Sequence, residues 1–114
     1  MKLITLLFLL TTAFAYADSN VIDFHIASGT KNGAWNTQDT MVQVRMGQIV
    51  HFINDDSVVH RLHTDGAPCE HGPEMKPGAT WDCVVKVVYD SEADGALYDH
   101  GFGQRAKFWI KATD

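Results

Sequence analysis

Short segments in which apolar and polar side chains alternate with a period of two constrain the fold of this chain more than any other feature. Such alternation is typical of β-strands that bury one face, and turn-favouring residues separate the segments. No window of ten residues shows a helical stripe. The alternating segments span residues 21–27, 40–46, 48–54, 60–64, 80–88, 95–99 and 107–113. Seven or eight short strands at this spacing predict an all-β fold, an antiparallel sandwich or barrel.

The first residues have the features of a secretory signal peptide. Lys2 precedes an apolar run over residues 3–10, and Ala15-Tyr16-Ala17 is a small-x-small pattern that suits signal peptidase. The apolar run is too short to span a bilayer as a helix. We therefore predict a signal peptide at residues 1–17, a single mature domain at residues 18–114, and a periplasmic or secreted location.

The charge of the chain limits its partners. Nine Lys and Arg residues stand against fourteen Asp and Glu residues, and removal of Lys2 with the signal peptide takes the formal net charge from −5 to −6. An acidic balance argues against nucleic acid and anionic membranes as partners. We expect a monomer that does not insert into a membrane once the signal peptide is removed.

The two cysteines, Cys69 and Cys83, are an even number in a chain that is predicted to reach an oxidising compartment. A disulfide bond between them is the first expectation. The alternative is that Cys69, two residues before His71, is a free thiolate that binds a metal ion. The sequence alone leaves both open.

The stretch from His60 to Gly72 holds three of the six histidines and one of the two cysteines. Imidazole nitrogen and thiolate sulfur are donors that copper and zinc prefer, whereas magnesium and calcium sites use carboxylates and carbonyls. We therefore predict a transition-metal site in this stretch. On an extended strand His60 and His63 would point to opposite faces, so they can share one metal only if the chain bends or bulges between them.

Three parts of the mature chain carry a family resemblance. Residues 47–60 form a strand and loop that end at a histidine, residues 60–72 and 75–81 form a strand, a Pro-Gly turn and the next strand, and residues 95–100 and 107–110 form the last two strands. This arrangement resembles the cupredoxins, a family of small copper-binding proteins. The resemblance implies a Greek-key β-sandwich and, position by position, copper ligands at His60 and His100.

The chain departs from the cupredoxin pattern directly after Tyr98. Cupredoxin electron carriers have a copper-binding cysteine at this position, whereas this chain has Asp99. Other donors should therefore complete the site. By the resemblance His71 lies at the same end of the sandwich, and it is the favoured third ligand, followed by His63. Further candidate donors are Cys69 and Met75, which would favour Cu(I), and Asp99, which could bind the metal or orient a metal-bound histidine.

The sequence favours an exported copper-binding protein with one histidine-rich mononuclear site, used for copper sequestration, delivery or tolerance. Copper is preferred to zinc because of the resemblance, the predicted export and the high affinity of Cu(II) for nitrogen donors. The expected partners are the copper ion and a protein that donates or accepts it. His25 and His51 lie far from the dense stretch in sequence, and we expect them to be ordinary strand histidines.

Three alternative functions remain at this point. The chain could be an electron-transfer cupredoxin with an unusual site, a small copper enzyme acting on superoxide or a related oxidant, or a metal-free structural module. The sequence shows no Ser-His-Asp spacing and no glycine-rich phosphate loop. A binding protein is therefore favoured over an enzyme.

Overall fold

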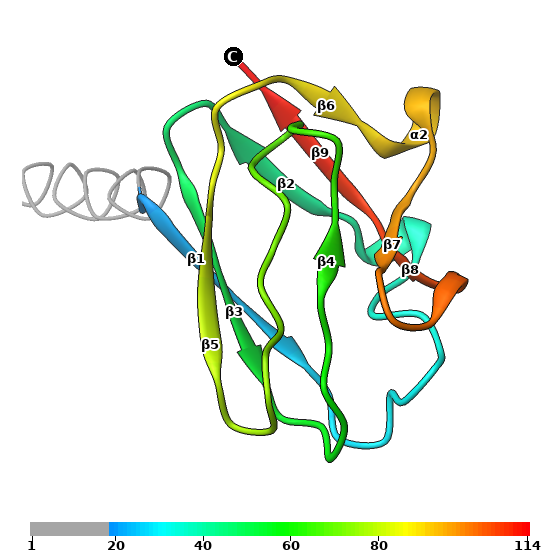
Figure 1. Ribbon diagram of the computed structural model, residues 1–114. Helices are drawn as coiled ribbons and strands as arrows, with labels where there is room; N and C mark the ends of the chain where they lie inside the picture. The colour runs from blue at the N-terminus through cyan, green and yellow to red at the C-terminus, as the bar shows by residue number, and fades with distance from the viewer. Residues whose placement is uncertain (1–18) are drawn as a thin grey trace, which may run out of the picture.

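Short β-strands dominate the part of the chain that the structure describes, residues 19–114 of a computed structural model (Figure 1). The predicted signal peptide, residues 1–17, lies outside the described residues. The strands are β1 (Val21–Ile26), β2 (Val42–Arg45), β3 (Ile49–Asn54), β4 (Leu62–His63), β5 (Thr80–Val84), β6 (Tyr89–Asp90), β7 (Leu97–Asp99), β8 (Gly103–Phe108) and β9 (Ile110–Thr113). A 3₁₀ helix (Gln38–Thr40) and the one-turn helix α2 (Ser91–Asp94) complete the fold. None of the described helices is long and apolar enough to cross a membrane.

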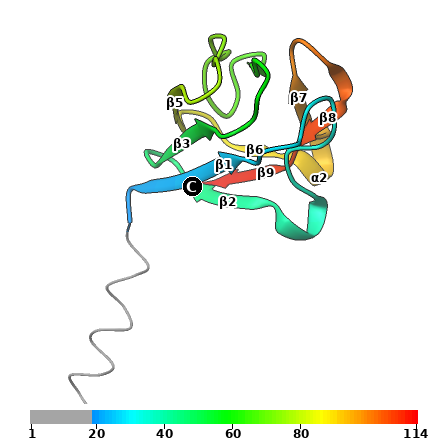
Figure 2. The same ribbon diagram turned by 90° about the horizontal axis from the view of Figure 1, so that it is seen from below.

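The strands form three sheets of three strands each, with the orders β1-β3-β5, β2-β9-β6 and β4-β7-β8. Strands β8 and β9 are one stretch of chain interrupted at Trp109, so the second and third sheets are neighbours, as Figure 2 shows. The β1–β3 and β2–β9 pairs are parallel, and the other pairs are antiparallel. The predicted β-sandwich is confirmed, but two of its three sheets are mixed and not antiparallel. Alternation reveals the faces of a strand and not the direction of its neighbour.

Aromatic side chains of the first sheet pack against β8, which belongs to the third sheet. On β3 every second residue is buried, which brings Phe52 to the inner face. The ring centroid of Phe52 lies 5.1 Å from that of Phe108 on β8, and the ring of Phe24 on β1 lies 5.0 Å from the same Phe108 ring. Edge-to-face contacts at these distances are favourable beyond the burial of their area. The sandwich therefore has a continuous aromatic core.

The predicted strand boundaries differ from the structure near the C-terminus. The predicted strand 107–113 is two strands, because Trp109 interrupts the sheet pairing. Its backbone N–H donates instead to Oδ1 of Asn36 at 2.7 Å. Residues 103–106, which begin β8, lie between the predicted strands 95–99 and 107–113, and α2 lies between the predicted strands 80–88 and 95–99. Elements of two to four residues, such as β6 and α2, are too short for any periodicity to reveal.

The predicted disulfide bond is confirmed. Cys69 and Cys83 are bonded to each other, and no cysteine among the described residues is free. The bond joins the loop before His71 to β5, and both cysteines are buried in the core. Cys69 is therefore not available as the thiolate ligand that the alternative interpretation required.

Loss of this disulfide bond should lower the free energy of unfolding by about 3 kcal/mol, because the bond closes a loop with a sequence separation of 14 residues and so restricts the unfolded chain. Urea denaturation of the double variant Cys69→Ala/Cys83→Ala checks this. Reduced wild-type protein serves as the control for the loss of the two buried sulfur atoms. An unfolding midpoint equal to that of the oxidised wild type in both samples would contradict the prediction.

Candidate metal centre

Three histidines from separate segments converge at one end of the sandwich. His63 lies on β4, His71 lies in the loop after Cys69, and His100 directly follows β7. One potential ligand nitrogen from each ring lies within 4.8 Å of those from the other two. His63 and His71 are half-buried and His100 is exposed. These residues are three of the four histidines that the sequence predicted as ligands.

The ring positions suit a single metal ion. Nδ1 of His63 lies 3.4 Å from Nδ1 of His100. Two nitrogens that each lie about 2.0 Å from a tetrahedral metal would be roughly 3.3 Å apart. The ring of His71 lies 4.9 Å from that of His63 and 5.1 Å from that of His100, centroid to centroid. A small rotation of the side chains would therefore bring the three rings around one ion.

Strand pairing fixes the ring of His63. His63 pairs with Tyr98 across the β4–β7 ladder, and the two rings stack with centroids 4.6 Å apart. Leu62, on the other face of the strand, is fully buried. Because successive side chains of a strand point to opposite faces, burial of Leu62 directs His63 away from the core and toward the other two histidines.

The loop that carries His71 is hydrogen-bonded to β4 and to the residue before it. The N–H of Gly72 donates to the carbonyl of Leu62 at 2.9 Å, and Nε of Arg61 donates to the carbonyl of Gly72 at 2.8 Å. A side chain at position 72 would be crowded, since a Cβ there would lie 3.2 Å from both the Leu62 carbonyl and the Trp81 ring. Together with the disulfide bond at Cys69, these contacts hold His71 beside His63.

The environment of His71 favours the neutral imidazole. Burial, followed by the charges of Arg61, His63 and His100, lowers the pKa of His71 below its ordinary value. The backbone N–H of Thr64 donates to Nδ1 of His71 at 3.1 Å, and only a ring whose Nδ1 carries no proton can accept it. A metal that takes Nδ1 would replace Thr64 as its partner. Neutral imidazole is the form that binds metals.

We expect His71 in the metal-free protein to titrate below about pH 6.5, the usual midpoint of a histidine. The unfolded chain then binds a proton that the folded chain does not bind, so this residue lowers stability as the pH falls through that range. An NMR titration of the histidine ring signals measures the midpoint, with a histidine in a short unstructured peptide as the reference. A midpoint of His71 above that of the peptide would contradict the expectation.

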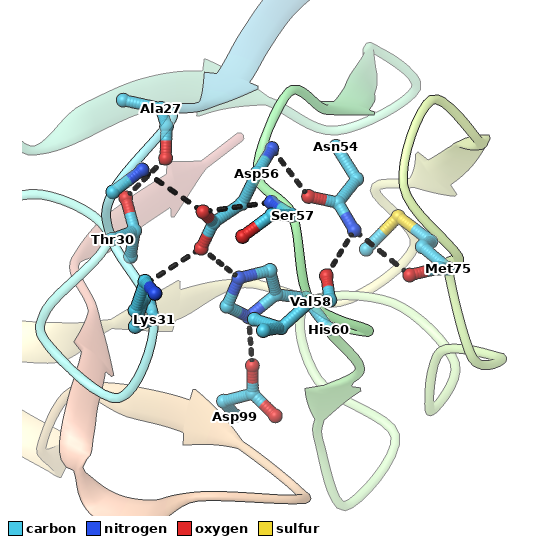
Figure 3. Close-up of polar contacts among 11 residues, drawn as sticks. Ala27, Thr30, Lys31, Asn54, Asp56, Ser57, Val58, His60, Met75 and Asp99 are labelled. Atoms are coloured by element: carbon cyan, nitrogen blue, oxygen red, sulfur yellow. Dashed lines mark hydrogen bonds and ion pairs between the residues drawn. The ribbon is translucent and has the colours of Figure 1, made fainter.

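His60 differs from its predicted position. Its side chain is fully buried on the same face as Leu62, and it does not belong to the group of three histidines. Nε2 of His60 lies 2.9 Å from Oδ2 of Asp56, and Nδ1 lies 2.5 Å from Oδ2 of Asp99 (Figure 3). Because both ring nitrogens have carboxylate partners, neither is free for a metal ion in this arrangement.

Asp56 is the most strongly perturbed carboxylate among the described residues. Burial raises its pKa, but hydrogen bonds from His60 and from the backbone N–H groups of Lys31, Ser57 and Gly29 together outweigh burial and hold the pKa well below its usual range. Figure 3 shows the donors of Lys31, Ser57 and His60 around the carboxylate. An ionised Asp56 can only accept hydrogen bonds, so Nε2 of His60 carries a proton, and this N–H donates a hydrogen bond to Asp56.

The further candidate donors Met75 and Asp99 do not belong to the group of three histidines. Met75 is buried in the core, where its backbone pairs with that of His60. Asp99 is buried and directed at His60, so among the predicted roles its position fits that of an orienting carboxylate better than that of a ligand. His25 and His51 form pairs with Asp55 and Asp82, both at 2.6 Å, on the sheet formed by β1, β3 and β5.

Two acidic residues near the histidines were missed in the sequence. Oδ1 of Asp65 lies 3.5 Å from Nε2 of His63, the nitrogen opposite the one that faces His100. A carboxylate at this position can orient an imidazole that binds a metal through its other nitrogen. Asp56 was also missed. In both cases the signal was a carboxylate within a few residues of a histidine.

Comparisons with known proteins bear on the fold. No protein-family model matches this chain, and no curated protein matches it in sequence. Similar solved structures include the Cu(I) form of a mutant of amicyanin, with 15% identity and a TM-score of 0.61 over 83% of this chain and 84% of that chain. They also include an oxidised amicyanin mutant, with 17% identity and a TM-score of 0.60 over 82% and 83% of the two chains. Amicyanin is a cupredoxin, and at this identity the likeness shows the fold alone. The chain therefore has a cupredoxin-like β-sandwich fold.

Proposed function

We propose that this chain is an exported copper-binding protein that holds one copper ion between His63, His71 and His100 and serves in copper sequestration, delivery or tolerance. The observation that carries the proposal is the convergence of three ligand nitrogens within 4.8 Å of one another. Copper is favoured over zinc because Cu(II) binds nitrogen donors more tightly. A similar fold in a protein with a Cu(I) form supports the same choice.

The exposure of the site favours exchange of copper over electron transfer. His100 is open to solvent, so a donor or acceptor protein can reach the ion directly. Among the described residues no free thiolate is present, because Cys69 is bonded to Cys83. Without a thiolate the site lacks the ligand that the electron-transfer cupredoxins use. The disulfide bond and the predicted signal peptide at residues 1–17 support an exported location.

Titration of the purified protein with Cu(II) and, separately, with Cu(I) tests this proposal. We expect one equivalent to bind, with nitrogen hyperfine structure in the paramagnetic resonance spectrum of the Cu(II) form. We also expect faint colour, because no thiolate-to-copper charge transfer can occur. Competition with Zn(II) checks the choice of metal. Failure to bind either copper ion, or preference for Zn(II), would refute the copper function.

A further inference from the structure

The buried group formed by Asp56, His60 and Asp99, here called the buried triad, has no role in the proposed copper site so far. It includes Asp99, the residue directly before His100, and His60 lies between the two carboxylates (Figure 3). The side chains of all three are at most 1% exposed. Burying charged groups is costly unless they are paired and hydrogen-bonded. A buried polar group in so small a core is therefore expected to have a role that offsets the cost of its burial.

The buried triad connects three segments that are distant in the sequence. Asp56 accepts hydrogen bonds from the N–H of Gly29 at 2.9 Å and from the N–H of Lys31 at 2.6 Å, which fixes the loop after β1. His60 belongs to the chain just before β4, where its backbone pairs with Met75. Asp99 is the last residue of β7. One imidazole therefore joins the segment after β3, which holds Asp56, to the end of β7, which holds Asp99.

The contacts of Asp99 extend to the residues around His100. Oδ1 of Asp99 accepts from the N–H of Gly101 at 2.9 Å, while its Oδ2 faces His60. The N–H of His100 donates to the carbonyl of Arg61 at 2.7 Å. The backbone is thus held on each side of His100, although the His100 side chain itself is exposed. Loss of the His60–Asp99 contact would release the side chain that holds the Gly101 N–H.

We propose that His60 is a positioning residue and not a metal ligand, and that the buried triad holds the His100 turn in the place where its ring meets those of His63 and His71. This inference rests on the proposed metal site. It also differs from what the cupredoxin resemblance implies, which is a copper ligand at His60. For His60 to bind a metal, its ring would have to give up the contact with Asp56 or with Asp99 and admit an ion into the buried interior.

Ring signals in NMR spectra test the assignment of His60. In the metal-free protein we expect Nε2 of His60 to carry a proton that exchanges slowly with solvent. Addition of Zn(II), a diamagnetic probe for the same nitrogen donors, should shift the ring signals of His63, His71 and His100 and leave the Nε2 proton of His60 in place. Loss of that proton, together with a ring shift as large as those of the other three, would make His60 a ligand and overturn the inference.

The variant Asp99→Asn tests the positioning role, because it keeps the size of the side chain and removes its charge. We expect Cu(II) to bind about 10–100-fold more weakly, with altered nitrogen hyperfine structure, as is typical when an orienting partner is lost. The matched control is Asp82→Asn, which alters the exposed His51–Asp82 pair, itself 2.6 Å long, and should leave both readouts unchanged. Unchanged affinity and spectrum in folded Asp99→Asn protein would overturn the inference.

Hydrogen exchange in the metal-free protein separates this inference from the copper function. The amide protons of His100 and Gly101 should exchange slowly in the wild type and faster when the triad is disrupted by Asp99→Asn or, if that variant does not fold, by His60→Gln. A wild-type protein that binds no metal but shows this difference would refute the proposed function and leave the positioning of the turn supported. Equal exchange in wild type and variant would overturn the positioning role.

Discussion

Replacing His100 with alanine is expected to weaken Cu(II) binding by at least about tenfold, which corresponds to about 1.4 kcal/mol. The substitution removes one of three converging ring nitrogens and leaves only two imidazoles at the site. Because the His100 side chain is exposed and its backbone N–H remains bonded to Arg61, the fold should be unaffected. Competition with a copper chelator of known affinity measures the change.

The variant His25→Ala is the matched control for this experiment. His25 is also an exposed histidine with a side chain 58% open to solvent, but it lies on β1 beside Asp55 and outside the group of three. We expect its copper affinity to equal that of the wild type. Equal losses in the His25 and His100 variants would mean that copper binds to surface imidazoles in general. No loss in His100→Ala would remove this residue from the site.

The alternation of β3 shows what the sequence can predict well. The predicted strand 48–54 and the observed strand Ile49–Asn54 differ by one residue, and every second residue from Val50 onward is buried. This accuracy has a physical cause, since a strand that buries one face must alternate in polarity. The direction of a neighbouring strand cannot be predicted in this way. Nothing in the alternation of β1 indicates that it lies parallel to β3, because the pairing depends on the path of the whole chain.

The structure brings three of the four predicted histidine ligands together and places His60 apart from them. The rule that residues three apart on a strand face opposite ways separates His60 from His63, and the structure agrees with it. The rule does not say which of the two histidines is buried. The apolar Leu62 indicates this, because it marks the buried face of the strand and His60 lies on the same face. The family resemblance implies a ligand at His60, whereas the burial of Leu62 indicates that His60 faces the core.

Burial of a histidine also predicts that hydrogen-bonding groups lie beside its ring. Once His60 is placed in the core, its two nitrogens each need a hydrogen-bonding group. Asp56 lies four residues earlier, whereas Asp99 lies 39 residues later and can be found only by tertiary structure. The position of His71 is equally non-local, since it depends on how the loop after Cys69 packs on β4. Local pattern therefore identified the donors, and long-range packing decided which of them meet.

Replacing Asp56 with alanine is expected to lower the free energy of unfolding by about 3–5 kcal/mol at neutral pH, the usual cost of removing one partner from a buried charged pair. The substitution leaves Nε2 of His60 and the N–H groups of Gly29, Lys31 and Ser57 without their acceptor. Urea denaturation measures the loss. The neighbouring variant Asp55→Ala is the control, because it removes an exposed carboxylate and should change stability by no more than about 0.5 kcal/mol.

The pH dependence of stability should distinguish a charged Asp56 from a merely well-packed one. Since folding lowers the pKa of Asp56, its contribution is fully present above the unfolded value of about 3.9 and is lost as the pH falls from there toward the lower folded value. The wild type should therefore lose stability steeply below about pH 4, and Asp56→Ala should lose less over the same range. Parallel curves for the two proteins would show that the carboxylate charge does not stabilise the fold. The stability of the loops around His60 would then have to come from packing alone, even though four hydrogen-bond donors face this one side chain.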